Sequence, residues 1–361
     1  MRGLNKVLFI LLAALFLSGC WDGVQLDNRS FVTAMSIDTE EGDYLVALEM
    51  PRVSRDANNM EKSVKSNTHR SLNNAIYGVD AHTDKEIFMG HMKIALLGEE
   101  LLENAEMLKH TLDTLARDRS ISRTLLILAA EGRGADLIEE ELEDEILMGV
   151  YISNFFGKKN FATLYRQTLD NLTKYFAEGK TAIIPKAEVN ENSPVFSGAA
   201  VMKDYALKGW LSEDELRGLI WLSNKAGRYN INIHNENEYF SINIDKYKWD
   251  MNFFEIGDNM IYAVISIKIE GDIEEAPIIA GKNTDSIIQK AKDSIEADIK
   301  KAYEALYIRI GADGLNMERT LEKKNPYLYK KYTEDEYKSI MDITVLLGVD
   351  VIINSKGAAA G

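Results

Sequence analysis

Hydrophobic and polar positions along the chain follow two periods, one typical of strands and one typical of helices. Residues 31–38 and 44–50 are rich in β-formers and are separated by Thr-Glu-Glu-Gly-Asp, so they predict a strand pair joined by a turn. The polar stretch 52–67 predicts a loop, and residues 71–79 predict a short helix. The chain therefore opens with a hairpin followed by a helix.

The next segments predict an α/β unit. Residues 86–98 are almost continuously apolar and predict a buried strand, and residues 123–130 predict a second one. Between them, one apolar helical face is formed by Leu101, Ala105, Leu108, Leu112 and Leu115. The order strand, helix, strand is typical of α/β packing. Residues 161–177 predict a further helix, and residues 181–189 predict extended chain.

The second half of the sequence gives sharper local signals. Residues 196–211 predict a hairpin that turns near positions 203 and 204. Ser212 and Glu215 form an S-x-x-E capping box, which predicts a helix running to about residue 223. The buried face of that helix is expected to hold Leu216, Leu219 and Ile220.

Alternating strands and a long helix are predicted for the C-terminal part. Residues 229–235, 238–244 and 260–271 alternate polar and apolar positions, which predicts a sheet with one solvated face. The following helix is expected to pack on that sheet through Ile288, Ala291, Ile295, Ile299, Ala302 and Leu306. Thr333 and Glu336 repeat the capping-box pattern and predict another helix start, and the chain ends in a strand within 342–357.

These elements predict an α+β or mixed α/β protein of small sheets packed with helices. The length of 361 residues suggests two or three domains. A polar joint, Asn-Glu-Asn-Ser-Pro, ends at Pro194 and is the best candidate for a boundary. We expect an N-terminal domain at 20–193, which allows a further division near residue 150, and a C-terminal domain at 194–361.

The first twenty residues predict a lipoprotein signal peptide. Two basic residues precede an eleven-residue apolar run, Val7–Leu17, which is shorter than the roughly 20 residues of a membrane span and fits a secretory signal. Leu-Ser-Gly-Cys then matches the bacterial lipobox, so cleavage is expected between Gly19 and Cys20, with a diacylglyceryl group on the Cys20 sulfur. Two acyl chains anchor stably where one does so only marginally. A signal peptide cut elsewhere, or a cysteine buried in an N-terminal helix, are the alternatives.

Net charge and cysteine content limit which partners the protein can bind and what can stabilise its fold. The formal charge is −15, and loss of Arg2 and Lys6 with the signal lowers it by two, to −17. Such a surface suits neither nucleic acid nor anionic lipid, so we expect a protein that does not lie down on its membrane. Cys20 is the only cysteine, so no intramolecular disulfide is expected and stability must come from the core.

Candidate chemistry is present only as fragments. Gly179-Lys180-Thr181 ends like a phosphate loop but lacks the first glycine of that motif, and 132–136 is too short for a dinucleotide loop. The acidic run 139–145 lacks the turn glycine and spacing of a calcium loop, so a solvated face is expected. No metal-ligand spacing relates the five histidines, and His91 is expected to be a core histidine. The sequence therefore predicts no catalytic residue, cofactor or metal.

Several segments resemble one family, the Ger(x)C lipoproteins that form the C subunits of spore nutrient germinant receptors. The opening Leu-Ser-Gly-Cys-Trp-Asp followed by 31–38 is similar to the start of that family. The other similar segments follow in the family's order: 90–102, 112–138, 196–222, 310–331 and 350–357. The resemblance spans nearly the whole mature chain, and 196–222 is its most specific part. Tyr329 stands near where many members have tryptophan.

The resemblance implies more than the residues alone. It implies an elongated body of several compact α/β domains on the outer face of the inner spore membrane. It also implies work with two integral membrane subunits, A and B, in sensing nutrients, without enzymatic activity. Two other hypotheses remain: a solute-binding lipoprotein, which needs two similar lobes around a cleft, and an anchored cell-wall hydrolase, which needs paired carboxylates or a zinc site.

Overall fold

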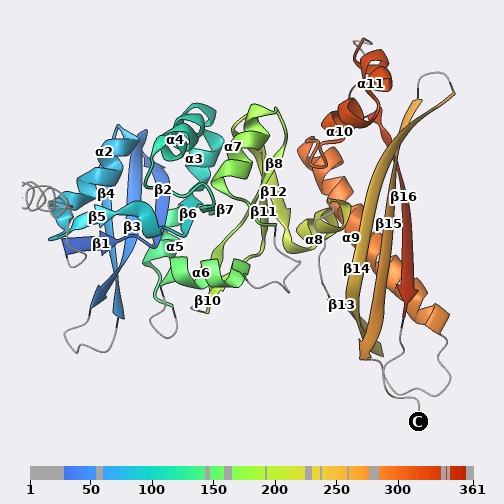
Figure 1. The fold of residues 1–361 in the computed structure, drawn as a ribbon, viewed down its shortest axis with the longest axis horizontal. Helices are drawn as coiled ribbons and strands as arrows, with labels where there is room; N and C mark the ends of the chain where they lie inside the picture. Colours follow the sequence, from blue (N-terminus) through green and yellow to red (C-terminus); the bar gives the residue numbers. More distant parts are fainter. Residues whose placement is uncertain are drawn as a thin grey trace, which may run out of the picture.

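The protein is a mixed α and β body, extended along one axis, with small sheets packed against helices (Figure 1). This confirms the predicted fold class. The computed structural model describes residues 28–53, 60–142, 147–157, 165–191, 193–223, 230–235, 238–257, 260–275, 284–334, 339 and 342–354.

A five-stranded sheet forms the N-terminal part, in the order β4-β3-β2-β6-β7. Strands β2 (Ala34–Glu40), β3 (Asp43–Val53) and β4 (Met60–His69) are antiparallel, whereas β6 (Ile94–Leu97) and β7 (Leu126–Ala129) continue the sheet in parallel from β2. Every residue of β6 and β7 is buried, because parallel strands are covered on both faces.

Helices cover both faces of this sheet. On one face lie α2 (Leu72–Tyr77), α3 (Glu99–Glu103) and α4 (Ala105–Arg117), and on the other lie α5 (Gly134–Glu139) and α6 (Met148–Gly157). Alternate residues of β6 therefore enter different cores: Ala95 and Leu97 pack with α4, and Ile94 and Leu96 pack with α6. The predicted strand-helix-strand unit is confirmed.

Three expectations for the N-terminal half need correction. Residues 60–69 form β4 rather than a loop; as an edge strand it is half solvated and lacks an apolar pattern. The strand expected at 86–98 is interrupted: β5 (Glu86–Phe88) pairs with β1 (Arg29–Phe31), and a short 3₁₀ turn at Met89–His91 separates it from β6. The described part of the helix expected at 161–177 begins only at Leu169, where Thr168 caps α7 (Leu169–Ala177).

A three-stranded sheet, β12-β11-β8, follows in the middle of the body. It combines β8 (Ala182–Pro185) with the hairpin β11 (Gly198–Lys203) and β12 (Ala206–Ser212). Asp204 and Tyr205 have φ of 52° and 63°, the two left-handed positions of a tight hairpin turn, so the predicted hairpin is confirmed. The proposed domain boundary at 193/194 falls within a small hairpin of β9 (Glu188–Asn190) and β10 (Ser193–Val195).

A four-stranded sheet, β13-β14-β15-β16, forms the far end of the body (Figure 1). Its strands are β13 (Asn230–Asn235), β14 (Glu238–Ile256), β15 (Met260–Glu275) and β16 (Thr344–Ile353). Helix α8 (Glu213–Leu222) and the long α9 (Thr284–Tyr303) share one hydrophobic cluster with this sheet. The expected stripe on α9 is confirmed, because all of its members except the partly buried Ile288 are buried there.

The last helices connect α9 to β16. Helix α9 continues as a π-helix at Glu304–Ile310, and α10 (Met317–Lys324) and α11 (Pro326–Thr333) follow. The helix start predicted at Thr333 is wrong: Thr333 is the last residue of α11, and its hydroxyl donates to the Tyr329 carbonyl at 3.0 Å. Asn325 is the actual cap of α11, with proline at the first helical position, and Glu336 lies outside the described residues.

We predict that Ser212→Ala lowers the free energy of unfolding by about 1 kcal/mol, the usual cost of a lost N-cap. The Ser212 hydroxyl accepts from the Glu215 amide at 3.4 Å, and the Glu215 carboxylate accepts from the Ser212 amide at 2.8 Å, which completes the predicted capping box. Urea unfolding followed by circular dichroism measures the change, with the exposed Ser66→Ala as control. Equal unfolding midpoints for the two variants would contradict the cap.

We also predict that Ile295→Ala destabilises the protein by about 2 to 5 kcal/mol, because it leaves a cavity between α9 and the sheet. Ile295 is 1% exposed, whereas its neighbour Glu296 is exposed. The same unfolding measurement should find Glu296→Ala close to the wild type. A wild-type midpoint for Ile295→Ala would mean that α9 is not held on the sheet.

Candidate functional site

The predicted anchor residues, Gly19 and Cys20, lie outside the described residues, so cleavage and lipidation remain predictions. The description begins at Asn28, next to β1, at one end of the long axis (Figure 1). Within the described ranges, no helix combines the length and the apolar character that crossing a membrane requires.

None of the candidate chemical fragments forms a metal site within the described residues. In the part of the chain that the structure describes, no three His, Cys, Asp or Glu side chains are grouped to hold a metal. The expectation that His91 is a core histidine is wrong. It is exposed in the 3₁₀ turn, and its ring packs edge-on against Phe31 at a centroid distance of 5.0 Å.

A lysine forms hydrogen bonds with backbone carbonyls at the start of the acidic run 139–145. Lys62 of β4 donates to the carbonyls of Ile138 at 3.0 Å and Glu139 at 3.1 Å, and also to that of Glu140. A cation suits the negative end of α5, although burial lowers the pKa of Lys62. The carboxylates of the described part of the run point to solvent, as predicted, and residues 143–145 lie outside the description.

Two of the three buried carboxylates that the sequence analysis missed cap helices. Asp38 is 2% exposed and accepts from the amides of Gly134 at 2.6 Å and Ala135 at 2.9 Å. Glu49 is fully buried and accepts from the amide of Met148 at 2.7 Å. Burial raises the pKa of Asp38, and the two amides oppose that shift. Both acids therefore have a structural role. In the fragment 132–136, which the sequence analysis compared with a dinucleotide loop, the backbone amides donate to the Asp38 carboxylate.

The phosphate-loop fragment is also occupied by a structural contact. The Thr181 amide donates to the Asn316 side chain at 2.9 Å, and the Asn316 amide group returns a bond to the Thr181 carbonyl at 3.2 Å. Asn316 takes a left-handed φ of 53°, which asparagine tolerates well. This reciprocal pair ties β8 to the turn before α10.

Trp210 of β12 lies where the N-terminal body meets the C-terminal part. Its indole donates to one oxygen of Glu99 at 3.0 Å, and the other Glu99 oxygen accepts from the Gly132 amide at 3.0 Å. Arg309 donates to the Trp210 carbonyl at 3.1 Å and to the Glu215 carboxylate at 2.7 Å. One line of hydrogen bonds therefore runs from Gly132, in the loop after β7, to the cap of α8.

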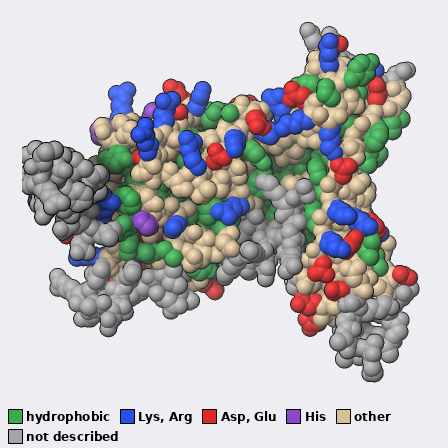
Figure 2. All heavy atoms as spheres, in the orientation of Figure 1, with side chains coloured by type: hydrophobic (Ala, Val, Ile, Leu, Met, Phe, Trp, Pro, Cys, Tyr) green, Lys and Arg blue, Asp and Glu red, His purple; other side chains and the backbone are tan. Residues whose placement is uncertain are grey.

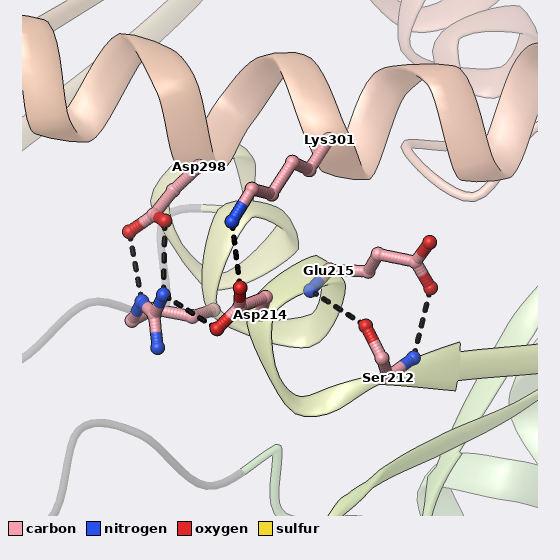
Figure 3. A network of polar contacts seen from close by, with 6 residues as sticks. Ser212, Asp214, Glu215, Asp298 and Lys301 are labelled. Carbon is pink, nitrogen blue, oxygen red and sulfur yellow. Dashed lines mark hydrogen bonds and ion pairs between the residues drawn. The ribbon is translucent and has the colours of Figure 1, made fainter.

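Helices α8 and α9 are joined by a charged network, drawn in Figure 3. Arg217 binds Asp298 through two nitrogens, at 2.8 and 3.0 Å, and also reaches Asp214 at 2.8 Å. Lys301 approaches the other oxygen of Asp214 at 2.6 Å. Hydrogen bonding to Asp298 raises the pKa of Arg217 further, so this guanidinium stays charged. The bidentate, largely buried Arg217–Asp298 pair is the strong member, whereas the half-exposed Lys301–Asp214 pair contributes little.

Close approach of backbones explains a glycine inside α8. A Cβ at Gly218 would lie 2.0 Å from the carbonyl oxygen of Asp298, so α8 and α9 meet almost backbone to backbone. We call this region, made by Glu99, Trp210, Glu215, Arg217, Gly218, Asp298 and Arg309, the junction.

The chain matches two protein-family models, an N-terminal one followed by a C-terminal one. Residues 22–189 match the family described as "Spore germination protein N-terminal domain", and residues 197–357 match "Spore germination B3/ GerAC like, C-terminal". Among curated relatives from Bacillus subtilis (strain 168), spore germination protein YndF is 23% identical over 97% of this chain and 96% of its own. Spore germination proteins B3 and KC are 25% and 24% identical, but the chain spans only 60% and 62% of their lengths.

A solved structure shares the fold. The crystal structure of the GerBC protein superposes with a TM-score of 0.61 over 89% of this chain and 96% of that chain. At 17% sequence identity, this likeness shows the architecture alone.

We predict that Gly218→Ala destabilises the protein by about 1 to 3 kcal/mol, because the added methyl overpacks the contact between α8 and α9. Without that contact, alanine in a helix would stabilise by roughly 1 kcal/mol. Gly157→Ala, in α6, is the matched control, since its Cβ would meet nothing within 4 Å. If both variants melt at or above the wild-type temperature, the close approach at the junction is wrong.

Several family-like segments are joined by hydrogen bonds at the junction or at the contact between Thr181 and Asn316. Glu99 lies in 90–102, Gly132 in 112–138, Trp210 and Arg217 in 196–222, and Asn316 in 310–331. Some of the residues in the family-like segments thus join separate parts of the fold, together with Asp298 and Arg309 from outside those segments. With both domains matched in order over nearly the whole sequence, the chain belongs to the Ger(x)C family of spore germination proteins.

Proposed function

We propose that this protein is a lipid-anchored, non-catalytic subunit of a spore nutrient germinant receptor. It would act with two integral membrane subunits, A and B, at the extracytoplasmic face of the inner spore membrane. The observation that carries this proposal is the lipobox ending in Cys20 in front of a chain that belongs to a family of germination proteins.

Tethering is the physical role of the anchor in this proposal. A protein confined beside its partners reaches them at an effective concentration in the millimolar range, so a modest interface is fully occupied. Two acyl chains hold the protein on the membrane, where one would exchange. The anchor and the folded body therefore have separate tasks.

The three buried acids of the described chain have structural partners, which fits a non-catalytic subunit. Asp38 and Glu49 cap helices, and Asp298 pairs with Arg217. These three carboxylates are bonded to backbone amides or to a guanidinium and form no pair with a second carboxylate among the described residues. A cell-wall hydrolase of the paired-carboxylate type would require such a pair.

A solute-binding lipoprotein is the alternative, and the architecture favours it less. Such proteins need two similar lobes around a hinge cleft. Here the N-terminal sheet has order β4-β3-β2-β6-β7 with helices on both faces, whereas the C-terminal sheet has order β13-β14-β15-β16 and packs on α8 and α9. A thermal-shift screen against amino acids and sugars separates the two: stabilisation by several degrees at millimolar ligand would favour the binding protein.

We predict that Cys20→Ala leaves the melting temperature unchanged but releases the protein from the membrane and impairs the response of spores to that receptor's nutrient. Fractionation, melting curves and germination assays measure the three effects. Replacing residues 1–20 with a transmembrane helix of about 20 residues should restore much of the response, since only tethering is required. If the Cys20→Ala protein stays on the membrane and the spores germinate normally, the anchor assignment fails.

A further inference from the structure

A cationic hollow lies at the N-terminal end of the body. It has a volume of about 540 Å³ and opens between β1, the ends of β3 and β4, and the turn that follows the 3₁₀ helix Gly78–His82. Its charged or titratable lining residues are Arg29, Arg52, Lys65, His82, Asp84 and Lys85.

Positive charge in the hollow is not neutralised within the described chain. The four lining Lys and Arg side chains form no ion pair with a described residue, and one carboxylate, that of Asp84, lines the hollow with them. Glu86 and Glu61 stand opposite Arg29 and Arg52 in strand register, yet neither pair closes to ion-pair distance. In a chain of net charge −15, unpaired cations around one hollow indicate an anionic ligand.

The Arg29 side chain is positioned by an aromatic contact and keeps unused hydrogen-bond donors. Its guanidinium lies over the Phe88 ring at 4.8 Å, and its Nε is buried with no hydrogen-bond partner. A planar guanidinium fixed on an aromatic ring presents its remaining donors in a set direction, which suits the oxygens of a phosphate.

The position of the hollow indicates that a membrane lipid supplies the phosphate. Arg29 is nine residues after Cys20, and nine extended residues span at most about 30 Å. Strand β1, which carries Arg29, lies at the end of the body opposite the four-stranded sheet (Figure 1), and Figure 2 shows Lys and Arg side chains at that end. A lipid attached at Cys20 would therefore bring the hollow within reach of the membrane surface.

We propose that this hollow binds the phosphodiester headgroup of an anionic phospholipid in the membrane that holds the anchor. The proposal rests on the proposed lipid anchor. It revises the expectation that the protein avoids anionic lipid. Exposed charges more than about 8 Å apart are largely screened at physiological salt, so the acidic remainder of the surface does not cancel the attraction between the cations of the hollow and a lipid headgroup. The acyl chains then fix one point of the protein, and the hollow fixes its orientation.

The test uses the chain 21–361, which lacks the signal and Cys20. The buried apolar residues described begin at Val32, so this chain keeps the entire described core. We expect it to bind vesicles of phosphatidylglycerol and phosphatidylcholine in cosedimentation at low salt, and not vesicles of phosphatidylcholine alone. Each cation near an anionic surface strengthens binding roughly fivefold, so the triple variant Arg52→Gln, Lys65→Gln, Lys85→Gln should bind on the order of 100-fold more weakly.

A matched control removes the same charge elsewhere. The triple variant Lys208→Gln, Lys300→Gln, Lys330→Gln changes three exposed cations outside the hollow and should bind nearly as the wild type. Melting curves establish that both triple variants are folded. Equal weakening by the two variants, or equal binding to both kinds of vesicle, would overturn the proposal.

Inorganic phosphate distinguishes the two sources of the ligand. If millimolar phosphate raises the melting temperature of the wild type but not of the hollow variant, and no vesicle binding is seen, the hollow is a site for a free anion and the lipid proposal is wrong. Because the chain tested has no Cys20, its result is independent of the anchor, which the Cys20→Ala fractionation tests separately.

Discussion

The structure depends on one small sheet whose two faces belong to different cores. Along β11, Ala200 and Met202 pack into the cluster of the N-terminal sheet, whereas Ala199 and Val201 pack into the cluster of α8, α9 and the C-terminal sheet. A strand has this property because its side chains alternate between faces. The two cores therefore share a wall, and the junction seals its edge with Trp210, Arg309 and the Arg217–Asp298 pair. A change on either side of β11 is felt by both cores.

The shared wall between the cores links two ends of the molecule that carry different features. The N-terminal end carries β1 and the cationic hollow, close in sequence to Cys20, and the C-terminal sheet lies at the other end of the long axis. A body with shared cores transmits the orientation set at one end to the other. In the proposed function, such a body would place a docking surface at a fixed position relative to the anchor.

Local signals in the sequence predicted local structure well, and long-range contacts escaped it. The Ser212–Glu215 capping box, the hairpin before it and the apolar stripe of α9 are set by residues close in sequence, and all are present. By contrast, β4 is a polar edge strand, and Asp38 caps a helix 96 residues later. The repeated pattern at Thr333 misled because a threonine can end a helix as well as start one. Neither the junction nor the hollow could be predicted, since each gathers residues from separate segments.

Purification of the anchored protein from spore membranes would show whether this protein works as a tethered subunit with membrane partners. The wild-type protein carries an affinity tag after residue 361, and the copurified proteins are identified by mass spectrometry. A tethered receptor subunit should be recovered in detergent together with two integral membrane proteins, the A and B subunits. Recovery of a transport permease in their place, or of no membrane protein at all, would contradict this role.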